Sequence, residues 1–149
     1  MSYEMELAQR IKNFERRLAR SEKLDRGWSF VPLTTPLTST DFDGDSFSTT
    51  AKTKIDLSAK FGVPAGIKAI NLGVSIRDSG SLNTDCFLIF SPNNTAGQGI
   101  GATCPRSNNA IYRSGINIPC DANGDIYYQV QASGAGTLNA WITVYGYWS

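Results

Sequence analysis

The spacing of hydrophobic residues changes once along the chain, near residue 26. Before that point, apolar side chains recur every three or four positions, which is the period of one face of a helix. The segment is otherwise rich in Glu, Arg, Lys and Ala, which are strong helix formers, and it holds every glutamate of the chain. Gly27 is the first glycine and follows where a left-handed residue often ends a helix. The pattern predicts a helix over residues 3–25 with apolar positions at Leu7, Ile11, Phe14 and Leu18.

This apolar stripe is narrow, and charged residues such as Arg10, Lys12 and Glu15 surround it. A helix that packs on its own domain usually has a wider apolar face, and an isolated helix of this length is only marginally stable in water. The spacing of the four apolar residues is that of a coiled-coil seam. We therefore expect residues 1–26 to self-associate. The alternative is an amphipathic helix that folds back onto its own domain.

From residue 28 onward, an alternation of apolar and polar positions replaces the helical spacing. It is clearest over residues 66–80, where every second residue from Ile70 to Ile76 is aliphatic, as in a strand with one buried face. Similar short segments follow one another along the chain, separated by Gly, Pro, Asp and Ser, and residues 56–62 predict a single helical turn. The pattern predicts an antiparallel, jelly-roll-like β-sandwich. Its other candidate strands are residues 52–57, 85–92, 109–120, 125–133 and 137–148.

Two carboxylate-rich pentads, Asp41–Asp45 and Asp121–Asp125, resemble calcium loops at first sight. A loop of the EF-hand type needs glycine at its sixth position and a bidentate glutamate at its twelfth. These positions hold Ser46 and Lys52 in the first case, and neither loop has the required residues. The glycine instead stands fourth, where Asp-Gly and Asn-Gly favour turns. We predict two metal-free turns and no cofactor, with weak Ca²⁺ binding as the alternative.

Composition and charge narrow the classes of function. The chain has 149 residues, of which 41% are hydrophobic and 18% charged, and its formal net charge is +1, so nothing in the balance favours nucleic acid as a partner. No apolar run approaches the ~20 residues that cross a bilayer, and the charged N-terminus is unlike a secretory signal. We expect the protein to be made in a cytoplasm and not to insert into a membrane.

The chain contains no histidine, which excludes Ser-His-Asp and Cys-His nucleophile systems. We therefore predict that the protein is not an enzyme. A hydrolase using carboxylate pairs such as Asp41/Asp43 or Asp121/Asp125 is the alternative. The three cysteines lack the spacing of metal ligands and are expected to be reduced thiols, although a Cys104–Cys120 disulfide stays open.

Aromatic side chains gather near the C-terminus. Alternation along residues 137–148 puts Trp141, Tyr145 and Tyr147 on one face, which could be core, a subunit contact or a platform that stacks sugar rings. The longest stretch without strand character, around residues 91–110, is polar and includes Asn93 and Asn94. Long polar loops often carry binding sites. These five residues are the candidate ligand-binding residues: Trp141, Tyr145, Tyr147, Asn93 and Asn94.

A charged helix with heptad spacing, followed by a Gly-, Asn- and Ser-rich β domain that ends in aromatics, resembles virion structural proteins of tailed bacteriophages. The similarity is to small trimeric tail-fibre and tailspike-like proteins, and residues 47–81, "FSTTAKTKIDLSAKFGVPAGIKAINLGVSIRDSGS", carry most of it. The resemblance implies a homotrimer on the tail or capsid surface. In such a trimer, the helix docks to other virion proteins and the head faces outward. The chain lacks the length and the repeating coils of the β-helix that cleaves polysaccharide in larger tailspikes.

Together these patterns predict three parts: an N-terminal coiled-coil stalk or anchor over residues 1–26, a linker leading into the head over 27–45, and a β-sandwich head over 46–149. The predicted function is multivalent attachment to the host surface, with a surface glycan as the expected host partner. A capsid decoration or cement protein and a cellular carbohydrate-binding module are the alternatives.

Overall fold

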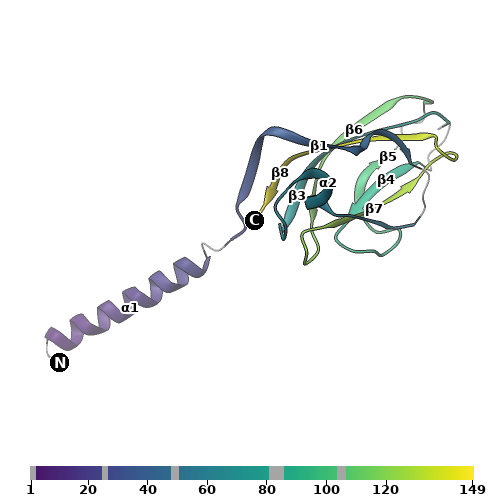
Figure 1. Cartoon of the computed structure of the whole chain (residues 1–149). Helices are drawn as coiled ribbons and strands as arrows, with labels where there is room; N and C mark the ends of the chain where they lie inside the picture. The colour runs from purple at the N-terminus through teal and green to yellow at the C-terminus, as the bar shows by residue number, and fades with distance from the viewer. Residues whose placement is uncertain (1–2, 25–26, 48–50, 81–85, 104–106) are drawn as a thin grey trace.

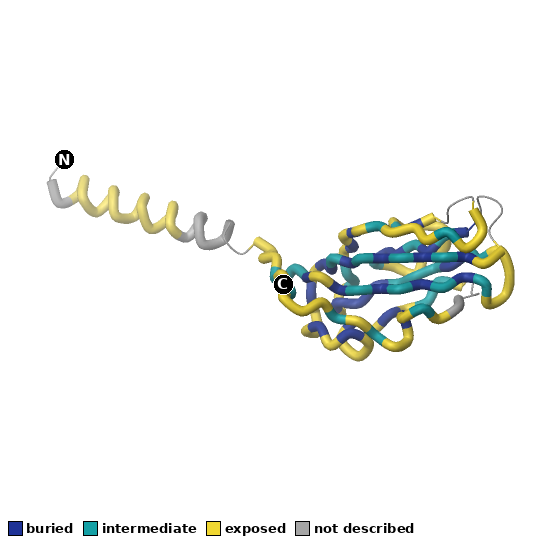
Figure 2. Tube along the Cα trace, turned by 90° about the horizontal axis from the view of Figure 1, so that it is seen from above, coloured by how far each residue is buried: buried dark blue, intermediate teal, exposed yellow. Residues whose placement is uncertain are grey.

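The computed structural model describes residues 3–24, 27–47, 51–80, 86–103 and 107–149. The predicted N-terminal helix is confirmed as α1 (Tyr3–Leu24). It projects away from the β domain (Figures 1 and 2), and every side chain from Met5 to Leu18 is exposed. Within the described part of the chain, neither helix has the length and apolar character to span a bilayer.

The described residues after α1 form eight strands and one short helix, α2 (Leu57–Phe61). In α2, the predicted helical turn is confirmed, and the residues that flank it explain its ends. The side chain of Asp56 accepts a hydrogen bond from the Ala59 amide at 2.9 Å, and Gly62 ends the helix at φ +75°. The strands are β1 (Phe30–Phe47), β2 (Thr53–Ile55), β3 (Ala69–Asp78), β4 (Phe87–Ser91), β5 (Ile100–Thr103), β6 (Ile111–Pro119), β7 (Ile126–Gln131) and β8 (Leu138–Trp148).

The strands form two four-stranded sheets, ordered β1-β8-β3-β6 and β2-β7-β4-β5. Every pairing is antiparallel. In chain order, the first strand pairs with the last, the second with the second last, and so on inward: β1 with β8, β2 with β7, β3 with β6 and β4 with β5. The strands are therefore arranged as one long hairpin that is rolled into two sheets. This is the connectivity of a jelly roll, and the predicted β-sandwich is confirmed. Figure 1 shows the two layers beyond the end of α1.

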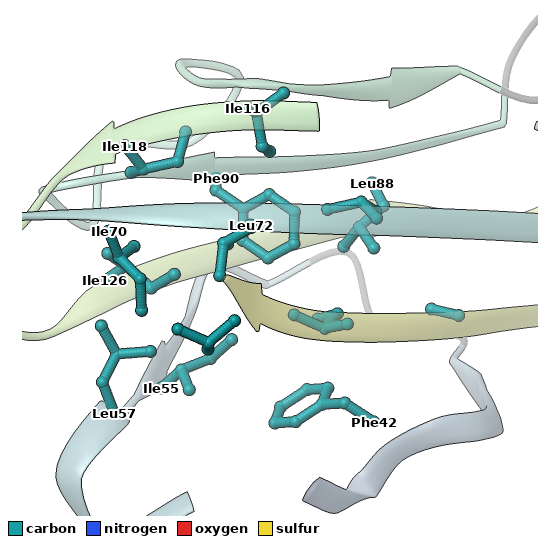
Figure 3. Packing of buried hydrophobic residues seen from close by; sticks show 14 of the residues in the cluster. Phe42, Ile55, Leu57, Ile70, Leu72, Leu88, Phe90, Ile116, Ile118 and Ile126 are labelled. Carbon is teal, nitrogen blue, oxygen red and sulfur yellow. The ribbon is translucent and has the colours of Figure 1, made fainter. Parts of the chain in front are cut away.

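The core lies between the two sheets. The alternation predicted for residues 66–80 is observed in β3, where the aliphatic residues from Ile70 to Ile76 are at most 1% exposed and their neighbours are half-buried. Leu88 and Phe90 of β4 enter the same cluster from the other sheet, as Figure 3 shows. Each such side chain contributes roughly 1.5–3 kcal/mol by leaving water, so the head has a core of its own without any contribution from α1.

The segment expected to be a linker, 27–45, differs from the prediction because most of it is strand β1, paired with β8. Register shifts interrupt this pairing, on either side of Asp43 among other places, and Gly44 has φ +86°. Prolines, threonines and bulges are tolerated on an edge strand, but they hide its alternation. The first acidic pentad is therefore part of a bulged edge strand, and its prediction as a turn was wrong.

The second pentad is a turn, as predicted. The Gly124 amide donates to the Asp121 carbonyl at 3.1 Å, and Gly124 has φ +88°. The carboxylate of Asp121 accepts from the amides of Asn123 and Asp125 at 2.8 and 3.0 Å. The turn connects β6 in one sheet to β7 in the other, so it closes the sandwich and is not the loop of a hairpin.

The predicted loop around residues 91–110 contains strand β5. Two glycines conceal it in the sequence. Gly101 lies so close to β4 that a Cβ there would be 1.9 Å from the Leu88 carbonyl oxygen. Only a residue without a side chain fits this position, so the strand lacks the apolar alternation by which the others were recognised.

Candidate functional site

Two surfaces hold the residues singled out by the sequence. The first is the apolar stripe of α1. Each of its residues is about half exposed, from 46% at Leu7 to 66% at Phe14. Three of them, together with Arg10, Asn13 and Arg17, line a shallow groove along the helix. In this structure α1 does not fold back onto the head (Figure 2), so the stripe has no partner within the described chain.

The second surface is a groove of about 370 Å³ on the outer face of the sheet formed by β1, β8, β3 and β6. β3 contributes Asn71, Gly73 and Ser75, which are the outward-facing partners of its buried aliphatic residues. β6 contributes Arg113 and Gly115, and β8 contributes Trp141, Thr143 and Tyr145. The groove therefore lies across three neighbouring strands.

Backbone forms the floor of this groove. Gly73 of β3 is the register partner of Gly115 of β6 and of Thr143 of β8. The two glycines lie side by side on the inner strand β3 and the edge strand β6, and they leave a depression where other residues would place side chains. A Cβ at Gly115 would have no atom within 4 Å, so the floor there is open.

Two aromatic side chains stand at the groove, and each rests against a glycine. The Tyr145 ring lies over Gly73, where a Cβ would be only 2.6 Å from Cε2 of the ring. The indole of Trp141 lies against Gly44 of β1, where a Cβ would be 3.0 Å from Nε1. The Arg77 guanidinium is 5.8 Å from the centroid of the Trp141 ring, within the range of a cation–π interaction. The bulge in β1 thus makes room for Trp141.

The charge of the groove is positive. Arg113 lines it, and no acidic residue of the described ranges does. The described ion pairs, Lys54–Asp125 and Lys60–Asp41, involve neither Arg113 nor Arg77. An acidic residue of the same sheet, Asp43, is the register partner of Trp141 on β1 but does not line the groove.

The structure brings Trp141 and Tyr145 together as expected, but it separates Tyr147 from them. β8 contains a bulge, since Val144 pairs with Leu72 while Gly146 pairs with Asn71. The extra residue reverses the alternation. Tyr147 therefore turns inward and packs against the core, and the prediction that it shares their face was wrong.

The two asparagines lie elsewhere. Asn93 follows β4, where its side-chain oxygen accepts a hydrogen bond from the Thr95 amide at 2.9 Å. It lines a separate pocket with Gln98 and Ile100, and Asn94 is exposed beside it. The sequence argument missed Gly73, Gly115 and Arg113, although Gly73 stood among the outward positions of the best-defined strand.

Three acidic residues of the two pentads, Asp41, Asp121 and Asp125, have structural partners. Asp125 is buried, accepts a hydrogen bond from the Leu57 amide at 3.2 Å and pairs with Lys54 at 2.6 Å. Asp41 forms an ion pair with Lys60. Over the described residues, no three His, Cys, Asp or Glu side chains gather as a set of metal ligands.

No protein-family model and no curated protein sequence matches the chain. Three solved structures have a similar fold at low identity. A family 6 carbohydrate-binding module from Cellvibrio mixtus lichenase 5A, solved with cellotriose, is 9% identical with a TM-score of 0.42 over 76% of this chain and 97% of that one. The Tobacco streak virus coat protein is 9% identical with a TM-score of 0.35, over 80% of this chain and 86% of that one. A CBM35 from Paenibacillus barcinonensis is 10% identical with a TM-score of 0.35, over 80% of this chain and 90% of that one. These scores do not assign a function.

Proposed function

We propose that the chain is an attachment protein of a bacteriophage virion, a tail-fibre or tailspike-like homotrimer. In this assembly, α1 forms a three-stranded coiled coil and the β-sandwich heads bind the host surface. The observation that carries the proposal is the apolar stripe of α1, which the head leaves uncovered. The similarity of residues 47–81 to small phage fibre proteins supports the phage assignment and the number three.

Burial of the stripe favours association. Leu7, Ile11, Phe14 and Leu18 each gain up to roughly 1.5–3 kcal/mol on full burial. Association costs translational and rotational freedom, and the stripe spans only two heptads. Contacts between heads must therefore add to the stability of the trimer. The same helix is available to dock the assembled protein to other virion proteins.

Trimerisation gives this architecture its mechanism. Three heads held on one stalk present three binding surfaces at high effective concentration, and several trimers on one particle multiply the effect. Linked sites of this kind gain on the order of 10²–10⁴ in avidity without any new contact. A weak single-site contact with a host glycan then becomes firm attachment, with the protein assembled in the host cytoplasm and displayed on the virion.

Two other functions fit parts of the structure. A capsid decoration protein would use the same stalk and head to bind coat subunits. A carbohydrate-binding module would act as a monomer, and the aromatic groove favours that function if α1 does not self-associate.

Localisation on the particle tests the proposal. Antibodies against the head, labelled with gold and viewed by electron microscopy, are expected at the tail and are expected to block adsorption to host cells. Labels spread over the capsid, with adsorption unchanged, would assign the protein to capsid decoration instead.

A further inference from the structure

We infer that the groove between Trp141 and Tyr145 is the glycan-binding site of the head, and that its ligand is an acidic polysaccharide that bears carboxylates. The inference rests on the proposed attachment function and adds to it the surface and the charge of the receptor.

The shape of the groove fits a sugar chain. Its floor is bare backbone at Gly115, where a Cβ would have no atom within 4 Å, and the Tyr145 ring covers the neighbouring Gly73. The Trp141 ring packs against Gly44 and lies beside the Arg77 guanidinium. Aromatic rings beside a few polar groups are the usual composition of a small-ligand site, and the apolar face of a sugar ring can pack on them.

Polar groups along the groove match sugar hydroxyls. The hydroxyls of Ser75 and Thr143 line it, and both residues are half-buried. The side-chain amide of Asn71 donates to Asn117 at 2.6 Å. This hydrogen bond uses the side-chain nitrogen of Asn71 and leaves its side-chain oxygen as an acceptor for a ligand.

Charge decides the class of glycan. Arg113 lines the groove without an ion-pair partner among the described residues, and none of their carboxylates lines it. A guanidinium binds a carboxylate through two parallel hydrogen bonds, which a neutral sugar cannot replace. The complementary ligand is therefore anionic.

A second copy of the chain is the competing occupant. The centre of a subunit interface is depleted in charge and filled by complementary apolar side chains. On this face, Gly73 and Gly115 are neighbours and Arg113 lies beside them. A Cβ at Gly115 would have no atom within 4 Å, so no apolar side chain fills that position. We therefore favour a ligand that enters the groove.

Gly115→Val is the direct test. Valine suits a strand, the position is not in the left-handed region, and a Cβ there would have no atom within 4 Å, so the new side chain can fill the floor. Arg113→Gln removes the charge alone. The control is Thr103→Val, at an exposed position on edge strand β5 of the opposite sheet. The full chain and each variant are applied to an array of purified bacterial surface polysaccharides, both carboxylate-bearing and neutral. Oligosaccharides of the bound polysaccharide are then titrated by calorimetry.

We expect the wild-type protein to bind carboxylate-bearing polysaccharides in preference to neutral ones. Gly115→Val and Arg113→Gln should each weaken binding by about tenfold or more, and Thr103→Val should not. Binding to no acidic polysaccharide, preference for neutral ones, or unchanged affinity in Gly115→Val would overturn the inference.

The assembled mass of each variant separates the two proposals. If the protein assembles but its binding does not depend on the groove, the proposed assembly stands and the proposed site is wrong. If the protein is a monomer whose binding of acidic glycans depends on Gly115, the proposed site stands and the proposed assembly is wrong. A loss of assembly in Gly115→Val would identify the groove as a contact between copies and contradict the inference.

Discussion

The ring of Tyr145 lies directly over Gly73, with Cε2 only 2.6 Å from the place that a Cβ would take. Gly73→Ala must therefore displace the ring. Tyr145 is 49% exposed and can rotate away, so the free energy of unfolding should fall by less than about 1 kcal/mol. Aromatic NMR shifts of Tyr145 should change markedly in this variant. Gly115→Ala, on the neighbouring strand and free of such contact, is the matched control. Equal shifts in the two variants would show that Gly73 does not position the ring.

The stripe of α1 makes a sharp prediction for assembly. Ile11→Asp combined with Phe14→Asp would bury unpaired carboxylates in the seam, at a cost of roughly 3–5 kcal/mol each. We expect sedimentation velocity to show dissociation at concentrations where the wild-type chain is assembled.

The matched control for this variant is Gln9→Asp combined with Lys12→Gln. It changes the net charge by the same amount at exposed positions that do not line the groove of α1, and it should stay assembled. An unchanged mass of the Ile11/Phe14 variant would mean that α1 binds another protein and does not join copies of this chain.

Asp78 is a buried carboxylate that connects the end of β3 to the segment between β7 and β8. It accepts hydrogen bonds from the Ser133 amide at 2.9 Å, the Gly80 amide at 2.8 Å and the Thr137 hydroxyl at 3.1 Å. Burial raises its pKa, but these bonds and those from Ser133 Oγ and Cys86 outweigh burial and lower the pKa to about 2. Asp78→Asn loses this charge-assisted acceptor and should destabilise the head by about 2 kcal/mol at neutral pH.

The same carboxylate predicts an acid dependence. The pKa of Asp78 lies below the ordinary value of 3.8, so the unfolded chain takes up the proton first as the pH falls. The contribution of Asp78 to the free energy of unfolding is complete above about pH 4 and is lost towards pH 2. Denaturant titrations should show the wild-type protein losing about 2 kcal/mol more over this range than Asp78→Asn does. Asp43→Asn, at an exposed position, should keep the wild-type slope, and a parallel decline in Asp78→Asn would contradict the assignment.

Cys86 and Cys120 carry reduced thiols, and Cys104 lies outside the described residues. Burial, with the nearby Asp121 and Asp125, raises the pKa of Cys120 to about 12, and Cys86 is only 2% exposed. Thiolates react and thiols do not. In a Cys104→Ser variant at pH 8, a disulfide reagent should label both cysteines slowly in the native protein and rapidly in denaturant. Rapid native labelling of either would contradict this burial.

The sequence predicted the elements whose local pattern agrees with their place in the fold. α1 has an apolar stripe, and β3 alternates because one face is buried and the other is half-buried. β1 and β5 were missed for the opposite reason. The bulges of β1 break its register, and Gly101 of β5 is required by close approach to β4, so neither strand retains a period of two.

The site was predicted in part for the same reason. Alternation along the last strand placed Trp141 and Tyr145 on one face, and the bulge at Tyr145 then moved Tyr147 to the other. Gly44, Gly73 and Gly115 carry no signal of their own, because their role depends on which side chain lies across from them. That relationship joins segments far apart in the sequence and is visible only in the folded sheet.

The mass of the intact assembly tests the central claim most directly. Native mass spectrometry of the full chain should give three times the chain mass of 16.2 kDa, and the trimer should persist on dilution to micromolar concentration. A species of one chain mass at all concentrations, with α1 still helical by circular dichroism, would contradict the account.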